Sequence, residues 1–319
     1  MPSTRRIIGF VLAGLLTATS PLAFRGQTAP DKLDRLRHQI EQVVRNKDGH
    51  VGLAIRHIET GQSLSINGDM PFPMASTFKV PILVELLAQV KDGRYRLEDE
   101  IEVQKSDQHL GSGMISSLAA PGIKLTVLNM AHFMMMISDN SATDILLAKV
   151  GAGNVNARLK GLGMEGISVD RSCQQLITDL LSTLGGARAR DLVKAAYIKF
   201  GEDPRDRATP EAMTSLLEKI QRREILDPGS CDLIIQIMMK CETGEARIKG
   251  QLPPGTTLAH KTGTIAGTVN DCGIITLPDG QGHLVLSIFT KDFVEETAEI
   301  EAIIAKIARL AFDYFLFAN

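Results

Sequence analysis

Hydrophobic residues recur at helical spacing at both ends of the chain. Between residues 31 and 47 they fall on one helical face, at Leu33, Leu36, Ile40, Val43 and Val44. A similar pattern near the C-terminus predicts a second amphipathic helix, with apolar positions at Ile300, Ile303, Ile304, Ile307, Leu310 and Ala311. The apolar face of this last helix must pack against another element, which we expect to be a β-sheet.

The strand-like segments also lie toward the two ends. Residues 50–68 read as two strands around a Thr60-Gly61 turn, and three further runs cover 256–267, 270–280 and 283–292. The long segment between them is mainly helical. This order predicts an α+β fold in which both ends of the chain contribute to one antiparallel sheet, flanked by N- and C-terminal helices, with a helical subdomain inserted.

We place the α/β subdomain at residues 30–68 and 247–319 and the helical subdomain at 69–246, including a long loop at 171–206. A chain of 319 residues is long enough for one large domain or two interleaved subdomains. Its formal net charge is −2, and it has no Lys/Arg block. The composition therefore does not indicate a nucleic-acid partner.

The first residues have the layout of a secretory signal peptide. Arg5 and Arg6 precede an apolar stretch that ends near Leu16, and small residues follow up to Ala23. We expect residues 1–23 to be removed and the protein to be secreted or periplasmic, with Sec and twin-arginine export both open. The apolar stretch is shorter than the roughly 20 residues that span a bilayer, so we expect no stable membrane anchor.

Export would permit disulfides among the four cysteines, Cys173, Cys231, Cys241 and Cys272. Three full pairings are open. A Cys231–Cys241 bridge is disfavoured, because on a helix the two residues would lie about 15 Å apart. The seven histidines and the cysteines show no metal-ligand spacing, and we expect no metal and no cofactor.

Candidate chemistry begins in the stretch PMASTFKVPILVELL, residues 73–87, where Ser76 and Lys79 are three positions apart in an apolar run. On a helix the two share a face. Burial would lower the pKa of Lys79 and make its amine a base for the serine proton. The alternative is a capped helix start, with Lys79 reaching out to water.

Two more triplets follow in order: Ser138-Asp139-Asn140 ends an apolar run, and Lys261-Thr262-Gly263 lies on a predicted strand. Together with Ser-x-x-Lys, this series resembles the class A serine β-lactamases and, more broadly, the penicillin-recognising serine enzymes. The resemblance runs from about residue 30 to the C-terminus. It implies a β-lactamase/D,D-peptidase-like fold with an inserted all-helical subdomain.

The resemblance also implies roles in the reaction. Ser76 would be the acylated nucleophile, and Lys79 the base or proton relay that activates it. Ser138 would pass a proton to the leaving nitrogen. The backbone N–H groups of Ser76 and Thr264 would form the oxyanion hole, as donors fixed before charge develops.

Further residues are implied in substrate binding. Asn140 would hold the side-chain amide of the substrate and also Lys79. Lys261 and Thr262 would bind the substrate carboxylate, and Gly263 completes their triplet. Arg247 stands where several family members keep an arginine that supports carboxylate binding, the alternative being a solvated surface arginine.

The chain departs from the family pattern at one motif. Class A enzymes carry Glu-x-x-Leu-Asn, whose glutamate activates the water that clears the acyl-enzyme. Here the glutamate position is Cys173 and the asparagine position is Ile177. Downstream, Asp206 is placed to pair with Arg171 and close the neck of a longer loop, which contains a predicted helix at 187–200.

Three explanations compete for this missing base. Another loop carboxylate could serve, the candidates being Asp179, Asp191, Glu202 and Asp203. The acyl-enzyme could instead turn over slowly. Finally, Cys173 itself could act, but no cation near it in sequence would lower its pKa, so we favour a buried, inert thiol.

Three functions follow from these explanations. The first is a secreted hydrolase that opens β-lactam rings through a Ser76 acyl-enzyme. The second is a D,D-peptidase-like penicillin-binding enzyme acting on peptidoglycan stem peptides, and the third is a β-lactam receptor that is acylated and not released. We expect the first, acting as a monomer, because the sequence shows no lipid signal, membrane anchor or accessory domain.

Overall fold

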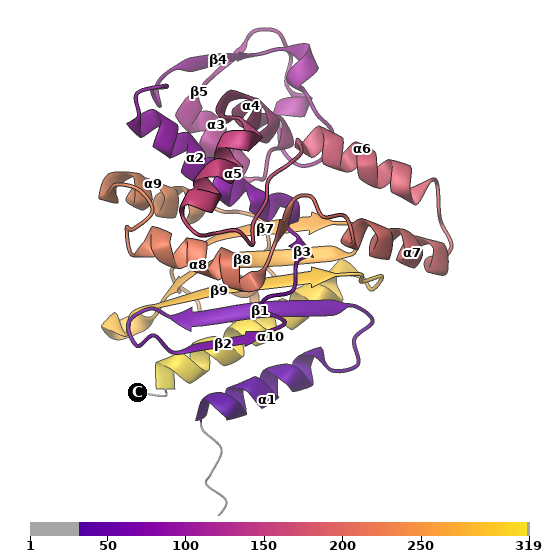
Figure 1. Ribbon diagram of the computed structural model, residues 1–319, viewed down its shortest axis with the longest axis vertical. Helices are drawn as coiled ribbons and strands as arrows, with labels where there is room; N and C mark the ends of the chain where they lie inside the picture. Colours follow the sequence, from indigo (N-terminus) through magenta and orange to yellow (C-terminus); the bar gives the residue numbers. More distant parts are fainter. Residues whose placement is uncertain (1–31, 318–319) are drawn as a thin grey trace, which may run out of the picture. The chain divides into compact units, whose positions relative to one another are not determined.

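A five-stranded antiparallel sheet, in the order β2-β1-β9-β8-β7, forms the centre of the computed structural model (Figure 1). Its strands are β1 (His50–His57), β2 (Ser63–Ile66), β7 (Leu258–Ile265), β8 (Thr268–Thr276) and β9 (His283–Lys291). Because β1 pairs with β9, the two ends of the chain meet in one sheet, as the sequence predicted. The structure describes residues 32–317, so the predicted signal peptide lies outside the described residues.

Two helices cover one face of this sheet. They are α1 (Lys32–Val44) and α10 (Thr297–Phe317), which contact each other, and α10 also packs on β8 and β9. Their apolar faces join the strands in one hydrophobic core that contains Leu36, Ile40, Ile304 and Phe312. This confirms both amphipathic helices and the sheet that the last one was expected to cover.

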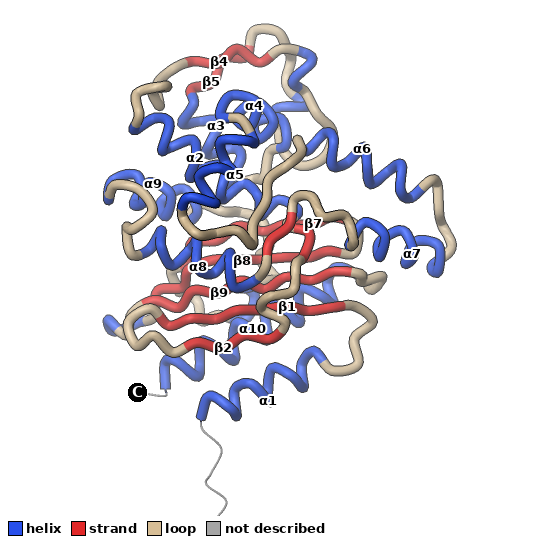
Figure 2. The backbone as a smooth tube through the Cα atoms, viewed as in Figure 1, coloured by secondary structure: helices blue, strands red, loops and turns tan. Residues whose placement is uncertain are grey.

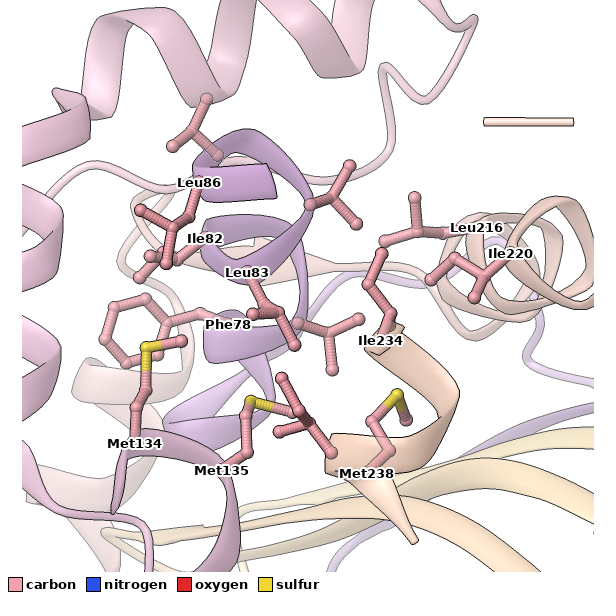
Figure 3. Packing of buried hydrophobic residues seen from close by; sticks show 14 of the residues in the cluster. Phe78, Ile82, Leu83, Leu86, Met134, Met135, Leu216, Ile220, Ile234 and Met238 are labelled. Carbon is pink, nitrogen blue, oxygen red and sulfur yellow. The ribbon is translucent and has the colours of Figure 1, made fainter. Parts of the chain in front are cut away.

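A second hydrophobic core lies on the other face. Helix α8 (Pro210–Gln221) packs on β1, β8 and β9, and α9 (Pro228–Met238) packs on β7. Helix α2 (Lys79–Lys91) runs through this core, with Phe78, Ile82, Leu83 and Leu86 facing methionines of α3 (Val127–Met136) and residues of α8 and α9 (Figure 3). Eleven of the thirteen α2 residues are buried, which explains why its sequence is apolar on all sides.

The inserted segment is mainly helical, but it also contains short strands (Figure 2). The remaining helices before residue 171 are α4 (Asn140–Val150) and α5 (Ala152–Gly161). The short strands form two antiparallel pairs, β3 (Phe72–Pro73) with β6 (Arg207–Ala208) and β4 (Glu100–Val103) with β5 (Ile123–Thr126). Strands of two to four residues are too short to show an alternating pattern, so the sequence did not indicate them.

The segment 171–206 was expected to be a long loop with one helix, and this was incomplete. It contains α6 (Cys173–Leu184) as well as the predicted α7 (Arg190–Gly201). Ser172 caps α6 by accepting a hydrogen bond from the N–H of Gln175, and Gly185 ends it in a left-handed conformation. These two capping residues indicate a helix, but the segment also resembles the Glu-x-x-Leu-Asn loop, and for this reason the sequence analysis predicted a loop here.

All four cysteines are buried free thiols, so none of the possible disulfides is formed. Within residues 32–317, no helix combines the length and apolarity that crossing a bilayer requires.

Candidate active site

Ser76 lies in a single 3-10 turn, Ala75–Phe78, that leads directly into α2. The preceding residue, Ala75, has φ of +47°, a left-handed conformation that is costly for a residue with a Cβ. This turn packs against β7. The chain is therefore bent so that the half-buried Ser76 stands at the start of α2, beside the edge strand of the sheet.

Lys79 is 0% exposed, so the alternative in which it reaches water is wrong. Its Nζ donates hydrogen bonds to the carbonyl of Ser138 at 2.7 Å, to Ser138 Oγ at 3.0 Å and to Asn140 Oδ1 at 3.1 Å. Burial lowers the pKa of Lys79, against the smaller opposing effects of nearby acidic groups. The amine is thereby moved toward the neutral form that a base requires.

Asp139 fixes the Ser138–Asn140 triplet in place. It caps α4 by accepting from the N–H of Ala142 at 2.9 Å, and its other oxygen accepts from the N–H groups of Met114 and Ile115. Ser138 has φ of +58°, so this loop, like the turn at Ala75, contains a residue in an uncommon left-handed conformation.

Lys261 approaches the same serine from β7. Its Nζ donates to Ser138 Oγ at 3.1 Å, so that hydroxyl lies between two buried amines. Burial and the neighbouring Lys79 lower the pKa of Lys261 to about 7. The three motifs, which are far apart in sequence, therefore meet at one point.

Gly263 allows β7 to lie close to the Ser76 turn. A Cβ at this position would lie 2.6 Å from the carbonyl oxygen of Met74 and 2.9 Å from the backbone nitrogen of Ser76. A two-residue turn joins the paired Ile265 and Thr268 at the end of the hairpin. Because hydrogen-bonded and non-bonded pairs alternate along antiparallel strands, the N–H of Thr264 points away from β8. Both expected oxyanion-hole donors therefore lie at this edge.

Arg247 is buried beneath β7 and is not a solvated surface residue. Its guanidinium donates to the carbonyls of Gly263 and Asn270, to Thr264 Oγ1 at 2.6 Å and to Glu301. Arg247 thus supports the strand that carries the expected carboxylate site. Thr262 Oγ1 in turn lies 2.5 Å from Thr243 Oγ1.

A pocket opens at Ser76, and its walls contain no carboxylate among the described residues. Its lining residues are Ala75, Ser76, Phe78, Gly111, Ser112, Asn140, Cys173, Leu176, Ile177, Leu180, Thr264 and Ile265. The apolar face of α6 forms one wall, and Gly111 and Ser112 also line the pocket.

Cys173 faces this pocket but is not poised to react. Burial raises the pKa of its thiol to about 12. The sequence suggested no nearby cation, whereas the structure brings Lys79 close enough to oppose this shift, without outweighing burial. Asp144 accepts from the N–H groups of Cys173 and Gln174 at 2.6 and 3.0 Å and from His109 at 2.7 Å, so it holds the start of α6.

The loop carboxylates considered as a replacement base lie elsewhere. Arg171 binds Asp206 at 2.6 Å, Asp179 at 2.8 Å and Asp203 at 3.0 Å. Asp206 also accepts from the N–H groups of Asp170 and Arg171, so the expected neck is present. The other two candidates, Asp191 and Glu202, are exposed, and neither lines the pocket.

Two positioning residues were missed by the sequence analysis. Asp144 holds α6, and Asn270 of β8 donates to the carbonyls of Pro73 and Met74, just before Ser76. The available signal for Asn270 was that a polar residue stands in a predicted strand of the central sheet, where a buried amide must find hydrogen-bond partners. No group of three or more His, Cys, Asp and Glu residues able to hold a metal ion occurs within 32–317.

Comparison with known proteins agrees with this geometry. The beta-lactamase enzyme family matches residues 35–315. The VEB-1 β-lactamase of Pseudomonas aeruginosa is 33% identical over 294 residues, covering 89% of this chain and 91% of that protein.

Two solved structures are also similar in fold. A β-lactamase from Chitinophaga pinensis has a TM-score of 0.77 at 30% identity, covering 89% of this chain and all of that one. A mutant of PBP-A, solved as an acyl-enzyme complex with penicillin G, has a TM-score of 0.75 at 27% identity, covering 89% of this chain and 97% of that one. The chain therefore belongs to the class A serine β-lactamase family, and it is a hydrolase that acts on β-lactams.

Proposed function

We propose that β-lactams are opened by attack of Ser76 Oγ on the lactam carbonyl. Lys79, whose pKa burial lowers, takes the serine proton, directly or by relay. Ser138 Oγ, hydrogen-bonded to both amines, delivers a proton to the leaving nitrogen. The N–H groups of Ser76 and Thr264 stabilise the oxyanion.

Substrate orientation would come from the remaining motif residues. The substrate carboxylate is bound by Lys261 and Thr262, on a strand that Arg247 supports. Asn140 holds the side-chain amide of the substrate and also accepts from Lys79. The apolar wall formed by Leu176, Ile177 and Leu180 receives the acyl side chain.

We propose further that hydrolysis of the acyl-enzyme is the slow step. The observation that carries this proposal is the lining of the pocket, which has Cys173 at the glutamate position and no carboxylate among the residues that the structure describes. A thiol with a pKa near 12 is protonated at neutral pH and does not activate water. Acylation is thus fully equipped, whereas deacylation lacks its base.

The test is intact-protein mass spectrometry with benzylpenicillin, followed from seconds to hours. We expect a penicilloyl adduct that forms quickly and decays slowly, while free penicilloate accumulates. Ser76→Ala should form no adduct, and persistent labelling of that variant would refute the nucleophile assignment. An adduct too short-lived to observe would refute the slow step.

A second test restores the missing base. The double variant Cys173→Glu with Ile177→Asn restores the glutamate and the asparagine of the Glu-x-x-Leu-Asn motif. Its adduct should decay at least about 100-fold faster than that of the wild-type protein, which is the scale of general base catalysis. Cys173→Gln with Ile177→Asn is the matched control, because its amide cannot take a proton. Equal decay of the two variants would contradict the proposal.

The lack of a glutamate at position 173 favours a second candidate function, a D,D-peptidase-like activity on peptidoglycan stem peptides. The acyl-enzyme of such a peptidase needs no β-lactamase-type base. Release of D-alanine from a synthetic stem peptide tests it, with Ser76→Ala as the blank.

We also propose that the protein is exported after loss of residues 1–23 and is secreted or periplasmic. We propose that it acts there as a monomer and contributes to antibiotic resistance. Fractionation of expressing cells tests the location.

A further inference from the structure

Behind the substrate-facing side of β7 lies a buried cluster that the proposed reaction does not use. It consists of Cys241, in the turn after α9, His260 of β7 and Asp271 of β8. The Nδ1 of His260 lies 3.0 and 3.1 Å from the two carboxylate oxygens of Asp271. Cys241 lies near this histidine, so that the two side chains influence the pKa values of each other.

A thiol, an imidazole and a carboxylate in this order form the arrangement that activates nucleophilic cysteines. Burial alone lowers the pKa of His260, but the charge and hydrogen bond of Asp271 outweigh it and raise the pKa to about 10. Burial alone raises the pKa of Cys241, but the hydrogen bond and charge of His260, together with Lys261, lower it to about 7. Cys272 is also nearby, but it is not charged at neutral pH, because burial raises its pKa well above the usual value.

The other cysteines provide an internal comparison. Burial raises the pKa of Cys173, Cys231 and Cys272, so that Cys241 alone of the four has a lowered pKa. Cys241 is 9% exposed and lies between the exposed Lys240 and Glu242, whereas Cys231 and Cys272 are 0% exposed. Cys241 is therefore the most exposed of the four cysteines.

Cys241 is also linked to the expected carboxylate site. Its Sγ lies 3.3 Å from Thr243 Oγ1, which in turn lies 2.5 Å from Thr262 Oγ1. A group attached to this sulfur would compete for the space of the Thr243 side chain. Thr262 would then lose the partner that orients its hydroxyl.

We propose that Cys241 is a modification site for small disulfides, which attach to it as mixed disulfides and weaken carboxylate binding at Thr262. The Cys241 thiolate attacks one sulfur of the reagent, and the S–S bond of the reagent breaks as the new S–S bond forms. The second sulfur leaves as a thiolate and takes up the proton held by His260. An added thiol reverses the exchange. The effect on carboxylate binding rests on the proposed function, whereas the reactivity of the thiol does not.

The reactivity is tested with bis(2-hydroxyethyl) disulfide at pH 7, using intact mass and peptide mapping of the native protein. We expect one adduct, at Cys241. Lowering a thiol pKa from 9 to about 7 raises the thiolate fraction about 50-fold at pH 7. A thiolate of lower pKa is also a weaker nucleophile, which reduces its rate constant for attack about tenfold. The net rate should be roughly fivefold above that of a thiol with a pKa of 9 and the same accessibility.

Variants identify the groups responsible. Cys241→Ser should abolish the adduct, whereas the matched control Cys231→Ala should keep it. His260→Asn should slow the reaction, and if that variant does not fold, the wild-type rate should still rise with pH around a midpoint near 7. An adduct at another cysteine, or one that forms only in urea, would overturn the proposal.

The link to the active site is measured separately, as the rate of acylation by benzylpenicillin before and after modification. Modified wild-type protein should acylate at least about tenfold more slowly and recover with dithiothreitol, and Cys241→Ser should be unaffected by the reagent. An adduct without any change in acylation would overturn the link. Absence of acylation in the untreated protein would instead count against the proposed function.

Discussion

Ser138 Oγ lies between two buried amines, and the closeness of these amines affects the charge state of the site. Lys79 and Lys261 are both 0% exposed and both donate to this hydroxyl. Two buried cations so close together disfavour each other, which adds to the effect of desolvation on the pKa of Lys261. Each amine therefore loses its proton more readily than an exposed lysine, and the proposed reaction uses Lys79 as the base and Lys261 as the cation that binds the carboxylate.

This arrangement predicts how acylation depends on pH. Lys261 binds a carboxylate only as a cation, and its pKa in the free enzyme is about 7. The second-order rate constant for acylation by benzylpenicillin should therefore fall as the pH rises above about 7, up to tenfold per pH unit. Lys261→Arg, whose guanidinium stays charged, should move this decline above pH 9. A wild-type rate that stays constant up to pH 9 would contradict the assignment.

The close approach at Gly263 gives a second prediction at the residue scale. In Gly263→Ala the new Cβ would lie within 3 Å of the Met74 carbonyl and the Ser76 nitrogen, so β7 and the Ser76 turn must separate. Because this displaces an oxyanion-hole donor, acylation should slow by about 100-fold or more.

A matched control for this variant is available on α5. At Gly153 a Cβ would meet no atom within 4 Å, so Gly153→Ala should leave acylation unchanged and slightly stabilise the helix. Stopped-flow acylation rates compare the two variants. Equal rates would show that the contact at Gly263 has no role in the reaction.

At the scale of elements, α6 is the part that distinguishes the site. Its first residue is Cys173, its N-terminus is held by Asp144, and Leu176, Ile177 and Leu180 form a wall of the pocket. Helix α7 packs against α6 (Figure 1), and the ion pair of Arg171 with Asp206 joins the two ends of the segment that contains both helices. Whether α6 stays in place therefore depends on a cluster of charges.

The neck should open in acid. Hydrogen bonding to Arg205 and the charge of Arg171 lower the pKa of Asp203 to about 2, and Arg171 also lowers the pKa of Asp179. Lowered carboxyl pKa values contribute stability above the unfolded value of about 3.9, and this stability is lost as the pH falls from there toward 2. Pepsin cleavage within 171–206 should thus increase over this range, before loss of far-UV circular dichroism.

Variants of the neck separate this effect from general acid unfolding. Asp206→Ala should increase cleavage between 172 and 205 at neutral pH, because Arg171 loses its 2.6 Å partner. The exposed pair Arg309–Asp313 on α10 offers a control, since Asp313→Ala should not change cleavage there. Unchanged proteolysis of Asp206→Ala would argue against the neck.

At the scale of the whole molecule, Asn270 connects the sheet to the Ser76 turn. From the first half of β8 its amide donates to the carbonyls of Pro73 and Met74, and its oxygen accepts from the N–H of Thr290 on β9. It is 0% exposed. One side chain thus joins two strands and the segment that positions the expected nucleophile.

Its removal should affect both stability and reaction. Asn270→Ala removes the amide donor to the Pro73 carbonyl and the acceptor of the Thr290 N–H, whereas the Met74 carbonyl keeps its hydrogen bonds from Thr77. The free energy of unfolding should fall by about 3 kcal/mol. Urea unfolding measures this, and acylation should slow as the Ser76 turn loosens. Asn154→Ala, an exposed position on α5, should change the free energy of unfolding by less than about 1 kcal/mol. A similar small change at Asn270 would contradict the role given to it.

Periodicity and motif order indicated most of this architecture. Residues 31–47 and the C-terminal helix were readable because an amphipathic face repeats over several turns. The five strands of the main sheet alternate or are bounded by turn residues, and they were found as well. By contrast, β3 to β6 are too short for a pattern, and α6 was hidden by its likeness to a loop motif.

The sequence by itself determined the α+β class, the family and the three motifs, because these depend on local spacing and on residue type. Only the tertiary structure decided that Lys79 is buried, that the candidate carboxylates surround Arg171, and that Cys241 meets His260 and Asp271. The physical reason is that pKa values and proton transfer depend on desolvation and on distances of a few ångströms. Contacts between residues far apart in the chain set both, and a pattern of neighbours does not contain them.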